Sequence, residues 1–209
     1  MINGNNSIDR YIRAALWLGY FTVFYNLLEG LVSVFFGARG EALTLFGFGI
    51  DSFIEVVSGT GIVVMLLRMR RNPQGESGRF EAAALRVTGL GFYILSAGLA
   101  LSAIYNILTA HKPETSLPGV IISLISISVM SALVVAKRKV GSALHSEPLL
   151  EDANCSLVCV YMSLILLAAS LVFKLTGFGL VDSIGALGLI YFSSHEGWES
   201  FKRAKGTSI

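Results

Sequence analysis

The amino-acid sequence predicts an all-α integral membrane protein, a bundle of six transmembrane helices with both termini on the cytoplasmic side. Of its 209 residues, 54% are hydrophobic and only 14% are charged, and the mean hydropathy is +0.68. In a soluble domain, roughly a quarter of the residues are charged. The charges also stand mostly between long apolar runs, which is the pattern expected of a chain surrounded by lipid.

Six apolar runs are each long enough to cross a bilayer. A membrane helix needs about 20 mostly apolar residues to cross the roughly 30 Å hydrocarbon layer. Helices are required because lipid cannot satisfy free backbone groups, and the runs lack the alternation of a barrel strand. We expect one domain over residues 1–209, with spans at 14–36, 42–67, 82–110, 117–136, 152–173 and 178–201.

The distribution of basic residues predicts the orientation. Cytoplasmic loops of membrane proteins carry an excess of Lys and Arg. With the N-terminus inside, only Arg39, Lys112 and Lys174 of the 16 basic residues fall in outer loops. This asymmetry predicts an N-in, C-in topology. The net charge of +2 is too small to indicate a nucleic-acid partner, and the polar N-terminus has no pattern of a removable signal peptide.

Two carboxylates lie inside the second predicted span. Asp51 and Glu55 are four residues apart, so both lie on one helical face, one turn apart. Unpaired carboxylates in hydrocarbon would take up protons, whereas a divalent cation between them would keep them ionised. The alternative is a structural network with a neighbouring Asn or Tyr. We favour a functional site, because no Lys or Arg lies within the central turns of any predicted span.

Cys155 and Cys159 repeat this spacing in the fifth predicted span. Taken alone, the pair is better explained as small buried hydrophobic residues. Depth favours a ligand pair, because Glu55 and Cys159 lie the same number of residues from the outer breaks at Gly40 and Lys174. Two helices would then present four ligand groups near one level, as a tetrahedral zinc site requires. Thiolates favour Zn²⁺ and softer ions such as Cd²⁺.

Other polar residues of the spans are weaker candidates. Asn26 and Glu29, in the first span, either line the same cavity or form hydrogen bonds between helices. Asp152 begins the fifth span, as a helix-start carboxylate or as a cytoplasmic group that receives the ion. Asp182 is interpreted as a helix-start carboxylate of the sixth span. Three polar residues are interpreted as a solvated end of the sixth span: His195, Glu196 and Glu199.

Motifs in three of these spans resemble the transmembrane domain of the cation diffusion facilitators. They are Gly49-Ile-Asp-Ser-Phe-Ile-Glu55, Glu151-Asp-Ala-Asn-Cys155 followed by Cys159, and Val181-Asp-Ser-Ile-Gly-Ala-Leu187. The segment Gly78-Arg-Phe-Glu81 also resembles the linker that precedes the third span in that family. The resemblance covers nearly the whole chain. It implies a family that exports Zn²⁺ and related divalent ions, generally against protons, from a site on spans two and five.

The resemblance also locates two departures from the family pattern. The family's acids of span two fall on Asp51 and Glu55, and its His and Asp of span five fall on Cys155 and Cys159. Two sulfurs in place of that harder pair leave the ion preference open. The cytoplasmic domain with which family members commonly dimerise is expected to be missing, so a homodimer would form through membrane helices. Short bacterial relatives without that domain are more similar still, which implies a bacterial inner (plasma) membrane.

The sequence therefore predicts a divalent-cation transporter that exports Zn²⁺ by proton antiport, with no cofactor besides the transported ion. That ion is Zn²⁺, or alternatively Cd²⁺ or another transition metal. A second hypothesis is a non-transporting metal sensor or scaffold protein on the same bundle. A redox enzyme is a third hypothesis, but no Cys-x-x-Cys pattern supports it, and we expect no enzymatic activity. Vectorial flux in liposomes discriminates a transporter from the other two.

The topology is testable by labelling engineered thiols. In a chain whose two native Cys are replaced by Ser, a Cys introduced at Gly75 should react only from the cytoplasmic side. A Cys introduced at Thr115 should react from the outside, because the two positions lie in loops on opposite sides of the predicted bundle. Labelling of position 75 by an impermeant reagent added outside intact cells would contradict the N-in, C-in topology.

Overall fold

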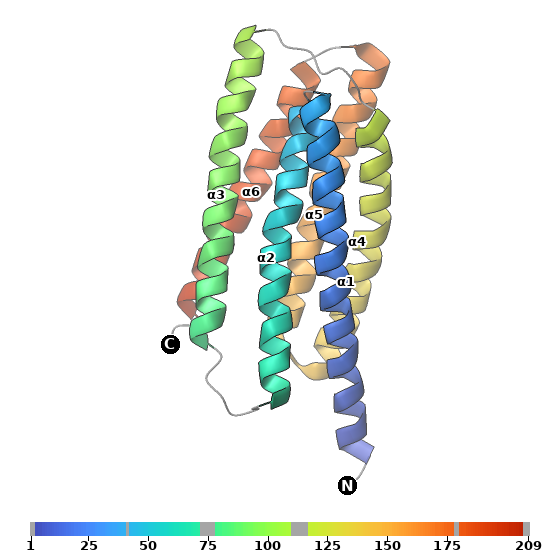
Figure 1. The fold of residues 1–209 in the computed structure, drawn as a ribbon, viewed down its shortest axis with the longest axis vertical. Helices are drawn as coiled ribbons and strands as arrows, with labels where there is room; N and C mark the ends of the chain where they lie inside the picture. The colour runs from blue at the N-terminus through green and yellow to red at the C-terminus, as the bar shows by residue number, and fades with distance from the viewer. Residues whose placement is uncertain (1–2, 41, 72–77, 110–116, 178–179, 207–209) are drawn as a thin grey trace.

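The chain folds into a bundle of long helices. The computed structural model describes residues 3–40, 42–71, 78–109, 117–177 and 180–206. This part of the chain contains six helices and no strand, which confirms the predicted all-α class (Figure 1). The helices are α1 (Asn3–Arg39), α2 (Leu43–Arg71), α3 (Gly78–Thr109), α4 (Leu117–Leu144), α5 (Glu147–Thr176) and α6 (Leu180–Gly206).

Five of the described helices are long and apolar enough to cross a membrane. These five identify a multi-pass membrane protein, with lipid as the surroundings of its many exposed apolar side chains. The five spans are Arg10–Arg39, Leu43–Arg68, Leu85–Asn106, Leu117–Leu144 and Asp152–Thr176.

α6 is not among these five, because it is less apolar than the other helices; the sixth span over 178–201 stays a prediction. The helix is present, but it carries acidic and hydroxyl side chains along its length. These side chains are turned into the bundle, where Asp182, Ser183, Ser193, Glu196 and Ser200 are buried. α6 still runs the length of the bundle, and both chain termini lie at the same end, called here the terminal end (Figure 1). That this end faces the cytoplasm stays a prediction from the basic residues.

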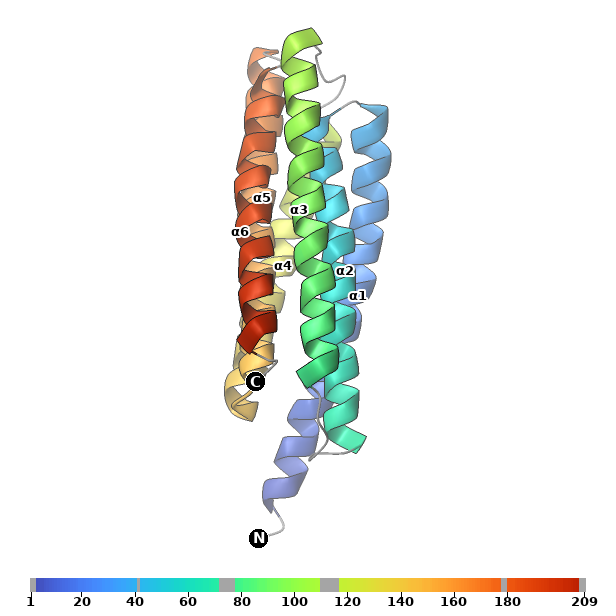
Figure 2. The ribbon, with the colours of Figure 1, turned by 90° about the vertical axis from the view of Figure 1, so that its left-hand side faces the viewer.

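α2 lies at the centre of the helix packing. It contacts α1, α3, α5 and α6, whereas α4 packs on α1 and α5. The most extensive contacts are those of α1 with α2, α3 with α6, and α4 with α5. Figure 2 shows α3 in front, with α1 and α2 on one side and α5 and α6 on the other. Polar side chains of α2 are therefore held among several helices rather than facing lipid.

Glycines bring α1 and α2 into close approach. A β-carbon at Gly37 would lie 2.5 Å from the backbone nitrogen of Phe46, and one at Gly49 would lie 2.7 Å from that of Val34. Both separations are shorter than a real side chain tolerates. Small residues commonly permit such backbone contact between membrane helices. The short separation allows side chains of α1 to reach the acidic face of α2.

Asp182 joins α6 to the start of α2. It lies in the first turn of α6, as the sequence interpretation requires. Its carboxylate accepts hydrogen bonds from the backbone N–H groups of Leu43 (2.6 Å) and Thr44 (3.1 Å). The Thr44 hydroxyl donates in return to the Asp182 backbone carbonyl, at 2.7 Å. Asp182 therefore satisfies free N–H groups at the beginning of another helix, which is a structural role.

The turn between α4 and α5 is much shorter than predicted. The predicted spans leave 137–151 as a break between them, but α4 continues to Leu144 and α5 begins at Glu147. His145 adopts a left-handed backbone (φ 48°), Ser146 is extended, and a proline stands in the first turn of α5. The basic run at 137–139 is therefore helical, and its residues face different directions around α4.

Lys137 turns into the bundle and pairs with Asp152, so the end of the fourth span predicted at 136, which placed this residue outside a helix, is wrong. Its ammonium lies 2.8 Å from the Asp152 carboxylate and also donates to the Ser156 hydroxyl at 2.9 Å. The Lys137 and Asp152 side chains are 2% and 8% exposed. Asp152 therefore lies within α5 rather than at its start, and an ion pair neutralises its charge. A buried pair of this kind is costly to break because one charge is left unpaired.

The ion pair gives a stability prediction. Asp152→Asn should lower the free energy of unfolding by about 3–5 kcal/mol, because it leaves the Lys137 ammonium buried without a counter-charge. The double variant Lys137→Met/Asp152→Leu should regain most of that loss. The control Arg138→Met, at an exposed neighbour, should cost less than about 1 kcal/mol. Denaturant unfolding in detergent micelles measures all three, and a neutral effect of Asp152→Asn would contradict the pairing.

Candidate metal centre

Three buried side chains meet between α2 and α5. Asp51, Glu55 and Cys159 each offer one ligand atom, and these atoms all lie within 4.8 Å of one another. The Cys159 sulfur lies 4.0 Å from Asp51 Oδ2, and its thiol donates to Glu55 Oε1. Their exposed fractions are only 2%, 8% and 3%. We call these residues the acid–thiol triad.

The positions along the helices agree with the depth comparison made from the sequence. Glu55 and Cys159 were expected at one level, and their side chains are in contact. Asp51 lies one turn along α2 and still reaches the same sulfur. Cys155, the fourth predicted ligand, is not part of this group of three. Its sulfur lies instead 3.8 Å from Glu196 Oε2 on α6.

α1 provides polar support on the other side of α2. The Asn26 amide donates to Glu55 Oε2 at 2.8 Å, so Asn26 touches the triad directly. Glu29 accepts from the hydroxyls of Tyr25 (2.8 Å) and Ser52 (3.1 Å) and is placed beside the triad. The structure therefore shows the hydrogen bonds between helices that the sequence offered as one alternative, and these bonds border the site.

The triad is rich in acceptors and poor in compensating charge. Among the described residues, neither Asp51 nor Glu55 forms an ion pair with Lys, Arg or His. Two buried oxygens in the region, Asp51 Oδ1 and Asn26 Oδ1, have no hydrogen-bond partner. Carboxylates buried without a counter-charge are costly, and a bound cation is one way to remove that cost. The donor set of two carboxylates and a thiol suits Zn²⁺ and related transition-metal ions.

A narrow cavity extends from the triad toward α6. Besides the three triad residues it is lined by Ser58, Phe92, Cys155, Val158, Met162 and Glu196. Sequence reasoning had placed Glu196 on a solvated helix end, whereas the structure buries it to 5% exposure. The signal for this was present in the spacing of Ser193, Glu196 and Ser200, which forms a polar stripe at helical period on α6.

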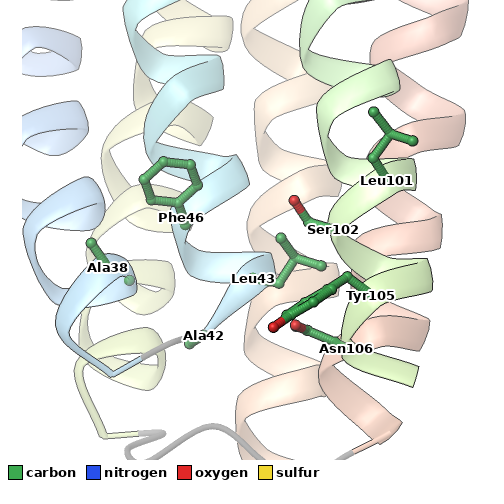
Figure 3. Close-up of a pocket in the computed structure, with 9 residues that line it drawn as sticks. Ala38, Ala42, Leu43, Phe46, Leu101, Ser102, Tyr105 and Asn106 are labelled. Atoms are coloured by element: carbon green, nitrogen blue, oxygen red, sulfur yellow. The ribbon is translucent and has the colours of Figure 1, made fainter. Parts of the chain in front are cut away.

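A second hollow lies at the opposite end of the bundle, between the ends of α1 and α2 and the side of α3 (Figure 3). Its volume is about 520 Å³. The described residues that line it are mostly apolar, with Ser102, Tyr105 and Asn106 as its polar members, and they include no carboxylate, thiol or imidazole. Its described lining therefore lacks the usual ligands of a transition-metal ion.

The fold and the triad define a class: a multi-pass helical membrane protein with a buried, acceptor-rich cluster suited to a cation. Comparison with protein families is more specific. The cation efflux transmembrane domain matches residues 20–205 of the chain. The chain therefore belongs to the cation efflux family, whose members are cation transporters, and the resemblance found in its sequence motifs is confirmed.

Proposed function

We propose that this cation efflux protein exports a divalent transition-metal ion, foremost Zn²⁺, in exchange for protons, and that the acid–thiol triad binds the ion during transport. The observation that carries the proposal is the meeting of three buried ligand atoms within 4.8 Å, with no basic side chain paired to their carboxylates. A homodimer through membrane helices and a bacterial inner membrane stay predictions from the sequence.

The geometry of the triad is compatible with zinc after a small contraction. Ligands at about 2.0–2.3 Å from a tetrahedral ion are about 3.3–3.8 Å apart. The triad atoms lie within 4.8 Å of one another, so shifts of about 1 Å would close them around an ion. Three protein ligands leave a fourth position for water or for another side chain of the cavity. The fourth position also gives an exchanging ligand access to the ion, which transport requires.

The hydrogen bonds of the triad suggest where protons are exchanged. The Cys159 thiol donates to one Glu55 oxygen, and the Asn26 amide donates to the other. A metal ion binds the deprotonated forms of Cys and Glu, so its arrival displaces the thiol proton. Asn26 can keep its hydrogen bond to Oε2 while the other oxygen turns to the metal. If the site opens alternately to each side, binding on one side releases protons and metal release on the other takes them up.

Loss of the triad carboxylates should abolish transport. Asp51→Ala and Glu55→Ala each remove a charged ligand, and we expect flux at least about a hundredfold below wild type while the protein still inserts. The matched control is Glu199→Ala, which removes a carboxylate from α6 outside the cavity, where it pairs with Lys202. Zn²⁺ uptake into proteoliposomes measures the effect.

Two outcomes of that experiment are informative. Full flux in the Asp51→Ala/Glu55→Ala double variant would show that the two carboxylates are structural. Tight Zn²⁺ binding by the wild-type chain without any vectorial flux would instead identify a membrane metal sensor or scaffold.

The single sulfur of the triad should influence which ion is preferred. Thiolates bind soft ions relatively better than carboxylates do. Cys159→Asp should therefore shift preference away from Cd²⁺ and toward Zn²⁺ or Mn²⁺, by about tenfold or more in the flux ratio. Competitive uptake of paired ions in the same proteoliposomes measures the ratio and cancels differences in protein amount. An unchanged ratio would remove Cys159 from the ion pathway.

A further inference from the structure

Cys155 and Glu196 form a second pair of metal-binding side chains outside the triad. The Cys155 sulfur lies 3.8 Å from Glu196 Oε2, and the residues come from adjacent helices, α5 and α6. Glu196 is 5% exposed and Cys155 is partly buried. A thiol and a carboxylate are both ligands of transition-metal ions, whereas either residue alone would not indicate a metal site.

The pair opens into the same cavity as the triad. Cys155, Glu196, Asp51, Glu55 and Cys159 all line it. Asp51 supplies an independent indication that this cavity takes a ligand, because its side chain is 2% exposed and its Oδ1 atom has no hydrogen-bond partner. Cys155 is one turn before Cys159 on α5, so the pair lies about 6 Å from the triad along the helix, toward the terminal end.

Arg203 places a positive charge next to this pair. Its Nη1 atom lies 3.5 Å from the Cys155 sulfur, and it stands about two turns beyond Glu196 on α6. The Glu196 carboxylate also lies 3.9 Å from Nδ1 of His195, so two side chains that can carry positive charge border the pair. A divalent cation that binds the Cys155 sulfur would take the place of the guanidinium contact.

From this geometry we propose that Cys155 and Glu196 form a second binding step for a thiophilic divalent cation, from which the ion passes to or from the triad. Glu196 thereby becomes a cation ligand supplied by α6. The step rests on the proposed function, because it is defined by its connection to the triad. This second step would divide the path of the ion through the bundle into two short transfers, each to or from a site that contains a cysteine sulfur.

The test uses Cys155 as its own reporter. The chain has two Cys, so Cys159→Ser leaves Cys155 as its single thiol. In the full-length chain in detergent micelles, the rate of alkylation by N-ethylmaleimide is measured as a function of Cd²⁺ concentration. Cd²⁺ bound by the pair should protect the thiol, because a metal-bound thiolate is a weaker nucleophile and is shielded from the reagent.

Variants at Glu196 then decide whether its carboxylate takes part. Glu196→Gln keeps the shape and removes the charge, so the Cd²⁺ concentration for half-protection should rise at least about tenfold. The control Glu199→Gln changes a carboxylate that pairs with Lys202 at 3.6 Å, and it should leave protection unchanged. Glu196→His offers another metal-binding atom and should restore protection.

Equal protection in the Glu196→Gln and Glu199→Gln chains would overturn the second step, as would the absence of protection with Glu196 intact. If Glu196→Gln does not yield folded protein, Glu196→His decides: retained protection supports the step, and lost protection overturns it. Zn²⁺ flux by the wild-type chain is measured separately in proteoliposomes. Absence of Zn²⁺ flux would overturn the proposed function. The protection of Cys155 by Cd²⁺ would still show whether Cys155 and Glu196 bind a cation.

Discussion

The cost of placing charge in a medium without water governs this structure. Asp51 and Glu55 lie in the middle of a helix that four other helices surround, and no basic side chain in the described part of the chain pairs with them. Hydrogen bonds from Asn26 and the Cys159 thiol satisfy only part of their acceptor capacity. The remaining deficit supports the proposal that the site binds a cation. By contrast, the Asp152 carboxylate forms an ion pair with Lys137, so its charge needs no bound cation.

The helix packing fixes the positions of the side chains around the buried carboxylates. Close approach at Gly37 and Gly49 brings α1 near enough for Asn26 to reach Glu55. On the far side, α5 presents Cys159 to both carboxylates of α2. Small residues and polar contacts therefore act together: the small residues let the helices approach, and the polar contacts orient the side chains of the acid–thiol triad. The lipid-facing surfaces have no comparable requirement, and large apolar side chains occupy them.

Much of this architecture is predictable from the sequence, and the exceptions have physical causes. Long apolar runs identify the helices, and the spacing of Asp51, Glu55 and Cys159 along them is sufficient to bring these residues together. The charge of Lys137 suggested a loop. Its side chain instead points into the bundle because Asp152 of the neighbouring helix pairs with it, and a hydropathy pattern carries no information about such a partner. Cys155 was grouped with Cys159 because they share a helix, yet one helical turn displaces it toward α6. Which neighbour a side chain meets depends on tertiary packing, and α6 hides its polar stripe by facing it inward.

The short connection between α4 and α5 has a mechanical consequence. Two residues join the helices, the ion pair of Lys137 with Asp152 ties them near that turn, and the Ser163 hydroxyl donates to that of Ser126 farther along at 2.9 Å. These links make α4 and α5 a stiff hairpin that resists being separated. If transport requires α5 to move, we therefore expect α4 to move with it, while the contacts of this hairpin with α1, α2 and α6 separate. The expected moving unit is a pair of helices rather than a single one.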